Sequence, residues 1–161
     1  MQTEINLLKF YPQSNRPIDE RGCLVTDQDR AVARKFDIEY FDGNRLTGYG
    51  GYNYNPRFWT KTVAYLKDFY NLDNDSKILD IGCAKGYMMH DLSLLIPDAE
   101  IKGIDISQYA KDHAIDSMKD NIVVSNANNI PFPDDHFDLV IAINTLHNLP
   151  LIDCKQAFRE L

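Results

Sequence analysis

The chain has 161 residues, 44% of them hydrophobic and 25% charged, which is typical of one globular domain with an extension. Its formal net charge of -7, without a cluster of Lys or Arg, argues against a nucleic-acid partner. The amino-terminal residues lack the features of a secretion signal, and no apolar run approaches the ~20 residues that cross a bilayer. The cysteines have no C-x-x-C spacing, which argues against a zinc site. We therefore expect a cytoplasmic protein without a metal or a membrane anchor.

The amino-terminal part of the chain predicts an extension of irregular and helical structure. Residues 1–25 show no hydrophobic periodicity and contain prolines, so we expect an irregular arm. Thr26 and Asp29 resemble a capping box and predict a helix over about residues 27–40. Residues 42–55, DGNRLTGYGGYNYN, combine glycine with tyrosine and predict a loop that can fold over a ligand.

From residue 56 onward, short apolar runs alternate with amphipathic stretches. We expect strands over residues 77–81, 100–105, 121–125 and 137–144. We expect helices over residues 56–71, 84–96 and 108–118, and a last helix that begins near Pro150. Strands separated by helices favour right-handed crossovers and a parallel sheet covered on both faces. The predicted fold class is therefore α/β, with a doubly wound, mostly parallel Rossmann-like sheet in residues 56–161 and an extension in residues 1–55.

The sharpest motif is ILDIGCAKGY, a buried strand that runs into a glycine-containing turn and then into a helix. Such a turn lets the backbone approach a ligand closely, next to the unpaired N–H groups of the helix. A dinucleotide-binding fingerprint would need Gly or Ala where this chain has Tyr87. Here the small residues Gly82, Ala84 and Gly86 are spaced by two and follow Asp80. A tight turn without a ligand is the alternative interpretation.

This spacing resembles the first motif, D/E-x-G-x-G-x-G, of the class I S-adenosylmethionine-dependent methyltransferases, and the chain is similar to their type 11/25 domains. Ala84 replaces the middle glycine of that motif. The resemblance implies that the backbone of Gly82, Cys83, Ala84 and Gly86 contacts the amino acid part of S-adenosylmethionine. It also implies that Asp80 accepts a hydrogen bond from the ammonium group of that cofactor, directly or through water.

A second acidic residue, Asp105, ends the next predicted strand within the sequence GIDIS. A carboxylate at this place can accept hydrogen bonds from both hydroxyl groups of a ribose. Strand ends also carry Asp as a helix cap, which is the alternative interpretation. The resemblance to the methyltransferases implies that the next residue, Ile106, packs on the adenine ring.

Residues 125–149, SNANNIPFPDDHFDLVIAINTLHNL, resemble the methyltransferase pattern G-D-A-x-x-L-P-F-x-D-x-x-F-D-L-V. Ala127 matches, while Asn126 replaces the usual Asp that accepts the adenine amino group, and its amide oxygen can still accept. Asn144 ends the last strand, where open α/β sheets place ligands. His147 is the histidine that we consider as a catalytic base, with a supporting or capping role as the alternative.

Residues 39–59 are similar to the lead-in of one group of bacterial class I methyltransferases. Within them, Tyr49 is a candidate to close over the methionine end of the cofactor, because aromatic faces favour a sulfonium cation. The alternative is that the tyrosines of this loop simply pack on the sheet.

The resemblance implies methyl transfer from S-adenosylmethionine to a small-molecule acceptor, with S-adenosylhomocysteine as the product. Two rivals remain: a catalytically inactive module that binds S-adenosylmethionine or a partner, and an NAD-linked oxidoreductase. The chain ends in AFREL, within the helix that leads to strand five in this family, so we expect the domain to be incomplete. The strand LVIAIN would then be an uncovered edge, which a homo-oligomer could cover.

Overall fold

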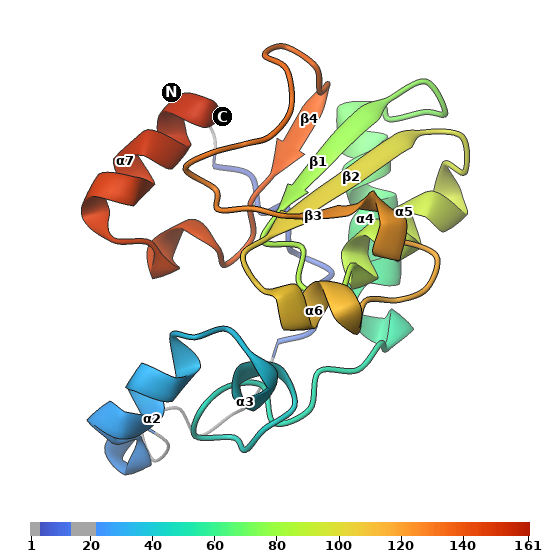
Figure 1. Ribbon diagram of the computed structural model, residues 1–161. Helices are drawn as coiled ribbons and strands as arrows, with labels where there is room; N and C mark the ends of the chain where they lie inside the picture. The colour runs from blue at the N-terminus through green and yellow to red at the C-terminus, as the bar shows by residue number, and fades with distance from the viewer. Residues whose placement is uncertain (1–3, 14–21) are drawn as a thin grey trace.

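The computed structural model describes residues 4–13 and 22–161, and its centre is a four-stranded parallel sheet (Figure 1). The strands are β1 (Lys77–Ile81), β2 (Glu100–Asp105), β3 (Ile122–Val124) and β4 (Leu139–Ile141). They lie in the order β3-β2-β1-β4, and every pair is parallel. The predicted fold class, α/β with a parallel Rossmann-like sheet, is confirmed.

The two faces of the sheet pack against different helices, because successive side chains of a strand point to opposite sides. Ile78 of β1 joins a core formed with α4 (Pro56–Tyr70) and α5 (Tyr87–Leu95). Its neighbour Leu79 joins a second core that includes Ala157 of α7 (Leu151–Glu160). Helices on both faces bury the central strand and make the sheet doubly wound.

The extension contains two short helices where the sequence predicted one helix over residues 27–40, so that prediction was wrong. The structure has α2 (Asp27–Ala33) and α3 (Ile38–Phe41) instead. The capping box of Thr26 and Asp29 does begin α2. The break occurs because Phe36 adopts a left-handed backbone with φ 49°, and Asp37 then caps a new helix by accepting a hydrogen bond from Ile38 N.

Three other predicted boundaries were also wrong. The helix expected from residue 84 begins at Tyr87, because residues 84–86 form the turn itself. The helix expected over residues 108–118 is only α6 (Gln108–Asp112), since Ile115 N donates to Lys85 O at 3.0 Å instead of continuing the helix. The last strand covers Leu139–Ile141 instead of residues 137–144, and Asn144, at the predicted end, has a left-handed backbone with φ 56°.

The amino-terminal extension lies at the carboxyl ends of the strands. Residues 4–13 form turns, as predicted, and Tyr11 packs on Trp59 of α4. Residues 1–3 and 14–21 of the predicted arm lie outside the described residues. Residues 22–24 are helical, so the prediction of an irregular arm as far as residue 25 was wrong there. α3 and the loop that follows it sit next to α6 (Figure 1).

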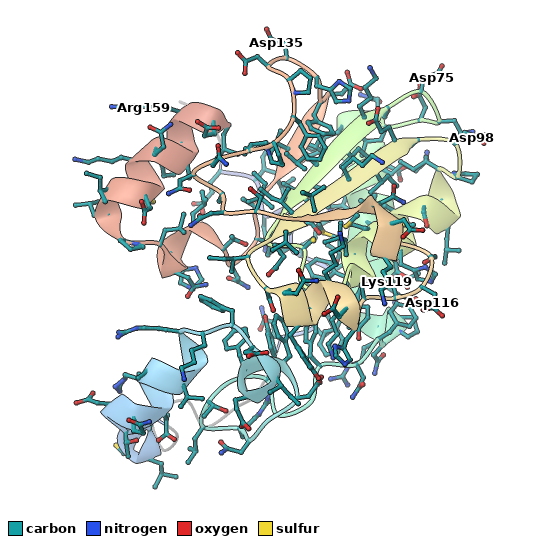
Figure 2. The ribbon with its side chains drawn as sticks, in the orientation of Figure 1. Asp75, Asp98, Asp116, Lys119, Asp135 and Arg159 are labelled. Carbon is teal, nitrogen blue, oxygen red and sulfur yellow. The ribbon has the colours of Figure 1, made fainter. Side chains whose placement is uncertain are left out.

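The opposite end of the sheet carries acidic residues in its connecting loops. Asp75, Asp98 and Asp135 precede β1, β2 and β4 and lie at the periphery of the molecule (Figure 2). Among the helices described, none is long and apolar enough to pass through a membrane.

Candidate functional site

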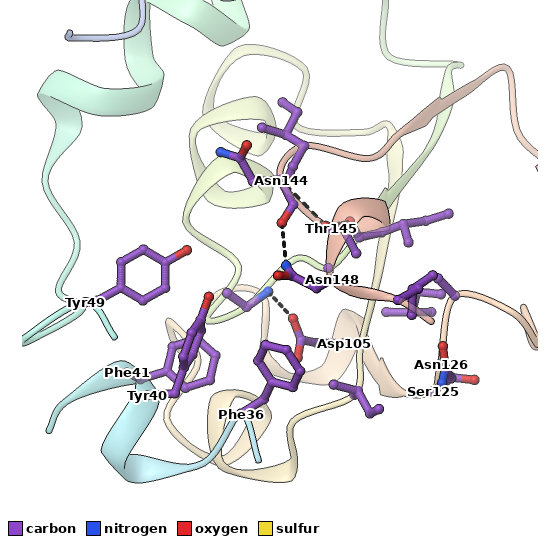
Figure 3. Close-up of a pocket in the computed structure, with 18 residues that line it drawn as sticks. Phe36, Tyr40, Phe41, Tyr49, Asp105, Ser125, Asn126, Asn144, Thr145 and Asn148 are labelled. Carbon is purple, nitrogen blue, oxygen red and sulfur yellow. Dashed lines mark hydrogen bonds between the residues drawn. The ribbon is translucent and has the colours of Figure 1, made fainter. Parts of the chain in front are cut away.

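A cavity opens at the carboxyl ends of β1, β2 and β4, between the sheet and the amino-terminal extension (Figure 3). It encloses about 680 Å³, counting the solvent at its mouth. Among the residues that line it, Asp105 is the only one of the types Asp, Glu, Lys, Arg and His. Open α/β sheets bind ligands at this end, where the strand order reverses.

The glycine turn forms one wall of the cavity. Gly82 and Gly86 both have φ 76°, and Ala84 has φ 51°, so three residues of the turn are left-handed. A Cβ on Gly82 would lie 2.1 Å from Thr145 Oγ1, which is itself held by donation to Ile81 O at 2.8 Å. Glycine at position 82 is therefore required both by its backbone and by the close approach of the loop after β4.

Asp105 fixes the turn to the end of β2. Its Oδ2 accepts a hydrogen bond from Ala84 N at 2.8 Å, and its Oδ1 accepts one from Ser107 N at 2.8 Å. Burial raises the pKa of this carboxyl, and the two backbone hydrogen bonds partly offset that rise. Each carboxylate oxygen keeps a lone pair for a further donor. Asp105 thus joins the glycine turn to the residues that follow β2, while Ser107 is the N-cap of the helix Gln108–Asp112, so the cap interpretation of Asp105 was wrong. Asp105 also presents an acceptor to the cavity.

Asp80 is a buried acid behind the glycine turn. It is only 4% exposed, and among the described residues no hydrogen bond reaches its carboxyl group. Burial, together with the nearby charge of Asp105, raises the pKa of Asp80 to about 8. A buried carboxyl without a partner is costly unless a cation or a donor joins it. The site therefore fits an ammonium group at this position.

The far rim of the cavity is polar. Ser125, Asn126 and Ala127 follow β3, and the side chains of Ser125 and Asn126 are separate from the aromatic wall (Figure 3). Asn144 lines the opposite side, where Asn148 Nδ2 donates to Asn144 O at 3.0 Å. Together these groups offer neutral donors and acceptors to a ligand.

The extension contributes an aromatic wall. Phe36, Tyr40, Phe41 and Tyr49 line the cavity on the side that faces Asp105 (Figure 3). Tyr49 stacks on Phe41 with ring centroids 6.1 Å apart, and Tyr40 meets Tyr49 edge to face at 5.3 Å. The loop is therefore part of the cavity and also packs within its own aromatic cluster.

Of the residues singled out from the sequence, most come together here. Those that line the cavity are Tyr49, Gly82, Ala84, Asp105, Ile106, Asn126, Ala127 and Asn144. Ile106 is 53% exposed, which is unusual for a large apolar side chain and leaves it free to contact a planar ligand.

Other sequence candidates are placed elsewhere. The Cys83 side chain is buried in the core next to Gly103, and Asp80 and Gly86 lie behind the cavity wall. His147 is exposed in a short 3-10 helix, Leu146–Asn148, and does not line the cavity. The structure therefore gives no geometric support to a catalytic role for this histidine.

Sequence reasoning missed several lining residues, including Phe36, Tyr40, Phe41 and Asn148. Phe36 and Tyr40 belong to the segment 27–40 that was predicted as a continuous helix, and Phe41 follows it. The left-handed backbone of Phe36 breaks that helix, which local periodicity did not indicate. Within the described residues, no group of acids, histidines and cysteines is arranged to hold a metal ion.

A comparison with protein families matches residues 78–161 to a methyltransferase domain. The matched segment contains the glycine turn, both acids and the polar rim. The chain belongs to the class I S-adenosylmethionine-dependent methyltransferases. The family interpretation drawn from the motifs is thereby confirmed.

Curated relatives are methyltransferases of several kinds. The malonyl-[acyl-carrier protein] O-methyltransferase of Legionella pneumophila is 35% identical over 75 residues, covering 44% of this chain and 26% of the relative. The ubiquinone/menaquinone biosynthesis C-methyltransferase UbiE of Vibrio campbellii is 27% identical over 151 residues, covering 89% of this chain and 53% of the relative. The 27-O-demethylrifamycin SV methyltransferase of Amycolatopsis mediterranei is 35% identical over 98 residues, covering 56% and 36%. The chain thus spans about half or less of the length of these relatives.

Solved structures share the fold. A Methanococcus maripaludis protein described as an S-adenosylmethionine-dependent methyltransferase aligns with a TM-score of 0.56 at 21% identity, covering 63% of this chain and 48% of that one. The [4+2]-cyclase SpnF aligns with a TM-score of 0.55 at 23% identity, covering 63% and 39%. At this identity the likeness establishes the fold alone, so the function must be argued from the site.

Proposed function

We propose that this chain binds S-adenosylmethionine in the cavity at the carboxyl ends of its strands and transfers the methyl group to a small molecule, leaving S-adenosylhomocysteine. One observation carries the proposal: Asp80, a buried carboxyl without a hydrogen-bond partner among the described residues, lies close to Asp105 on the adjacent strand, and Asp105 lines an otherwise uncharged cavity. The cofactor presents an ammonium group and a ribose diol to match these two acids.

Each end of the cofactor has its own set of residues. Asp80 accepts from the ammonium group, and the backbone from Gly82 through Cys83 and Ala84 to Gly86 lies along the amino acid part. This assignment is supported by the left-handed turn, which removes side chains from the side that faces the cavity.

The nucleoside end is held by groups from β2 and β3. Asp105 accepts from the ribose hydroxyls, and the exposed side chain of Ile106 packs on one face of the adenine. Asn126 accepts from the adenine amino group through its amide oxygen, next to the small residue Ala127. Support comes from the fact that all four residues line the cavity.

The reacting end lies between the extension and the loop after β4. When bound, S-adenosylmethionine supplies an activated methyl group on a positively charged sulfur. The Tyr49 ring and the carbonyl and amide groups near Asn144 offer electron-rich surfaces to that charge. The chain then contributes mainly orientation and exclusion of water, which are the usual sources of rate in such transfers.

The acceptor is proposed to be a small organic molecule. The relatives named above act on carbon and on oxygen atoms, by their names, and the cavity holds no lysine or arginine that would bind a phosphate backbone. We assign no catalytic base, because His147 lies outside the cavity.

Calorimetric titration with S-adenosylhomocysteine and with NAD, side by side, tests this function. We expect binding of the nucleoside product and no binding of NAD. Tight binding of NAD alone would establish the oxidoreductase instead, a role that Tyr87 disfavours because it occupies the third glycine position of the dinucleotide motif. Binding of S-adenosylhomocysteine without consumption of S-adenosylmethionine in an acceptor screen would favour the inactive module.

We further propose a cytoplasmic protein that self-associates along β4. In the described sheet, β4 pairs with β1 on one side and with no strand on the other. An exposed parallel edge offers unpaired backbone groups to a second copy. Light scattering after size-exclusion chromatography tests this, and a monomer of 18.5 kDa would contradict it.

A further inference from the structure

The glycine turn contains a buried lysine, Lys85, whose ammonium group binds other residues of the protein. Lys85 is 4% exposed, although it lies between Ala84 and Gly86. Its Nζ donates to Asp42 Oδ2 at 2.6 Å and to Tyr52 O at 3.0 Å. The side chain therefore points away from the cavity and into the extension.

Asp42 collects hydrogen bonds from three separate segments. Besides Lys85, Tyr109 of α6 donates its hydroxyl to Oδ2 at 2.7 Å, and Tyr52 N donates to Oδ1 at 3.0 Å. Burial by itself raises the pKa of Asp42, but the bonds from Lys85, Tyr52 and Tyr109 outweigh it, so that the pKa lies below its usual value. The carboxylate thus joins the glycine turn, the extension and α6.

Two further contacts stabilise the attachment of the extension to the glycine turn. The Tyr87 hydroxyl donates to Tyr52 O at 2.9 Å, so this carbonyl receives donors from both Lys85 and Tyr87. The Lys85 ammonium also lies 5.7 Å from the centre of the Tyr109 ring. These contacts fix the loop that carries Tyr52 to the start of α5.

The pair stands directly behind the aromatic wall of the cavity. Phe41 immediately precedes Asp42, and Phe41 stacks on both Tyr49 and Tyr109, with centroids 6.1 and 6.3 Å apart. Ala84, next to Lys85, faces the cavity. A shift of Asp42 away from Lys85 would therefore move the aromatic wall away from the glycine turn.

We propose that Asp42 and Lys85 form a positioning pair that holds the cover segment, residues 36–55, closed over the cofactor site. This inference rests on the proposed function. The Lys85 side chain is 5% exposed and that of Asp42 27%, so each charge depends on its partner to offset the loss of water. Closure by the pair and occupation of the cavity then reinforce each other, because a bound nucleoside contacts the aromatic wall that the pair holds in place.

Affinity for S-adenosylhomocysteine, measured by calorimetry, is the first test. We expect K85M and D42N each to raise the dissociation constant about tenfold, equivalent to roughly 1.4 kcal/mol. The double variant should bind no more weakly than either single variant, because the two residues act as one unit. D42E keeps the charge on the more exposed partner and should restore most of the affinity. R30M is the matched control, since Arg30 pairs with Asp27 at the exposed surface of α2.

The second measurement is the rate of trypsin cleavage after Arg45, with and without S-adenosylhomocysteine. If Asp42 and Lys85 only stabilised the fold, the ligand would still slow this cleavage in their variants. Arg45 lies in the cover segment and donates to Tyr49 O. We expect S-adenosylhomocysteine to slow this cleavage in the wild type and in R30M, but not in K85M or D42N. If the charge variants prove unfolded, Y109F removes only one hydrogen bond from Asp42 and should weaken binding by a smaller factor, about threefold.

The outcomes separate this inference from the proposed function. Wild-type affinity and wild-type protection in both K85M and D42N, or fully additive effects in the double variant, would overturn the positioning pair. Failure of the wild type to bind S-adenosylhomocysteine would overturn the proposed function. In that case, faster cleavage at Arg45 in D42N than in R30M would still support the positioning pair, and equal cleavage would overturn it.

Discussion

Asp105 on β2 and Asp80 on the adjacent strand β1 are close enough for their carboxyl groups to interact electrostatically. Asp80 pairs in register with Gly103, and Asp105 lies two residues farther along β2. Burial, and after it this nearby charge, raises the pKa of Asp80 to about 8. Without a cation beside it, Asp80 is therefore protonated at neutral pH. An ammonium group bound there would favour the ionised form and lower that pKa again.

The first prediction concerns the pH dependence of S-adenosylhomocysteine binding. Because the ligand prefers ionised Asp80, affinity should rise as the pH increases from 6 to 8, and close to one proton should be released per ligand at the lower end of this range. Calorimetry in buffers of different ionisation enthalpy measures the proton count. D80N should bind more weakly and release no proton. A pH-independent affinity in the wild type would show that Asp80 does not meet the ammonium group.

The same ionisation also affects the empty protein. The folded pKa of Asp80 lies above the unfolded value of 3.8, so the folded state holds a proton that the unfolded state has lost. The contribution of this group to stability is therefore greatest at low pH and declines as the pH rises toward 8. Urea unfolding between pH 5 and 8 should show a shallower pH dependence in D80N than in the wild type.

The second prediction concerns Asp105. D105N keeps the shape of the side chain but replaces one acceptor oxygen by a donor, so it should weaken S-adenosylhomocysteine binding by about 10- to 100-fold, the range expected for lost hydrogen bonds to a charged group. The ratio of affinities for adenosine and for 2′,3′-dideoxyadenosine gives the more specific readout. The wild type should prefer adenosine, and D105N should lose most of that preference. An unchanged ratio would mean that Asp105 serves only to hold the backbone N–H groups of Ala84 and Ser107.

The third prediction concerns the glycine turn. G82A forces a Cβ to within 2.1 Å of Thr145 Oγ1 and places a side chain on a backbone with φ 76°. We expect a loss of about 2–4 kcal/mol in the free energy of unfolding, from strain and overpacking together. Urea denaturation measures it. G22A is the control, because a Cβ there has no atom within 4 Å, and the prediction fails if both variants are equally stable.

Several residues of this site could be predicted from short stretches of the sequence. Gly82, Gly86 and Asp105 depend on short-range rules, in which a strand, a left-handed turn and a helix follow one another within a few residues. The parallel, doubly wound sheet follows in the same way from alternating strands and helices. Such features need no knowledge of distant contacts, which is why the sequence was sufficient for them.

The remaining features depend on contacts between distant parts of the chain. Lys85 reaches Asp42 across 43 positions, and no local pattern marks either residue as a partner. Ile115 N bonds to Lys85 O, and this long-range bond ends the helix that the periodicity extended to residue 118. The propensity of a segment is a weak guide where tertiary hydrogen bonds compete with it. Boundaries next to the site were therefore the ones predicted least well.

The last prediction concerns Phe36, whose left-handed backbone is uncommon for a bulky residue. Strain of about 1–3 kcal/mol is expected at such a position. The ring lines the cavity and meets Tyr40 edge to face at 5.0 Å, so the strain accompanies a contact that faces the ligand. Asn tolerates this backbone better than Phe does.

The F36N variant should therefore lose affinity for the ligand while its free energy of unfolding stays nearly unchanged. Relief of strain offsets the lost packing, so the free energy of unfolding should change by less than about 1 kcal/mol. The affinity for S-adenosylhomocysteine should nevertheless fall about fivefold or more, since the aromatic wall loses a ring. F69N, on α4 outside the cavity, is the matched control and should leave the affinity unchanged. Equal affinity in F36N and the wild type would mean that the left-handed turn at Phe36 serves only to connect α2 and α3.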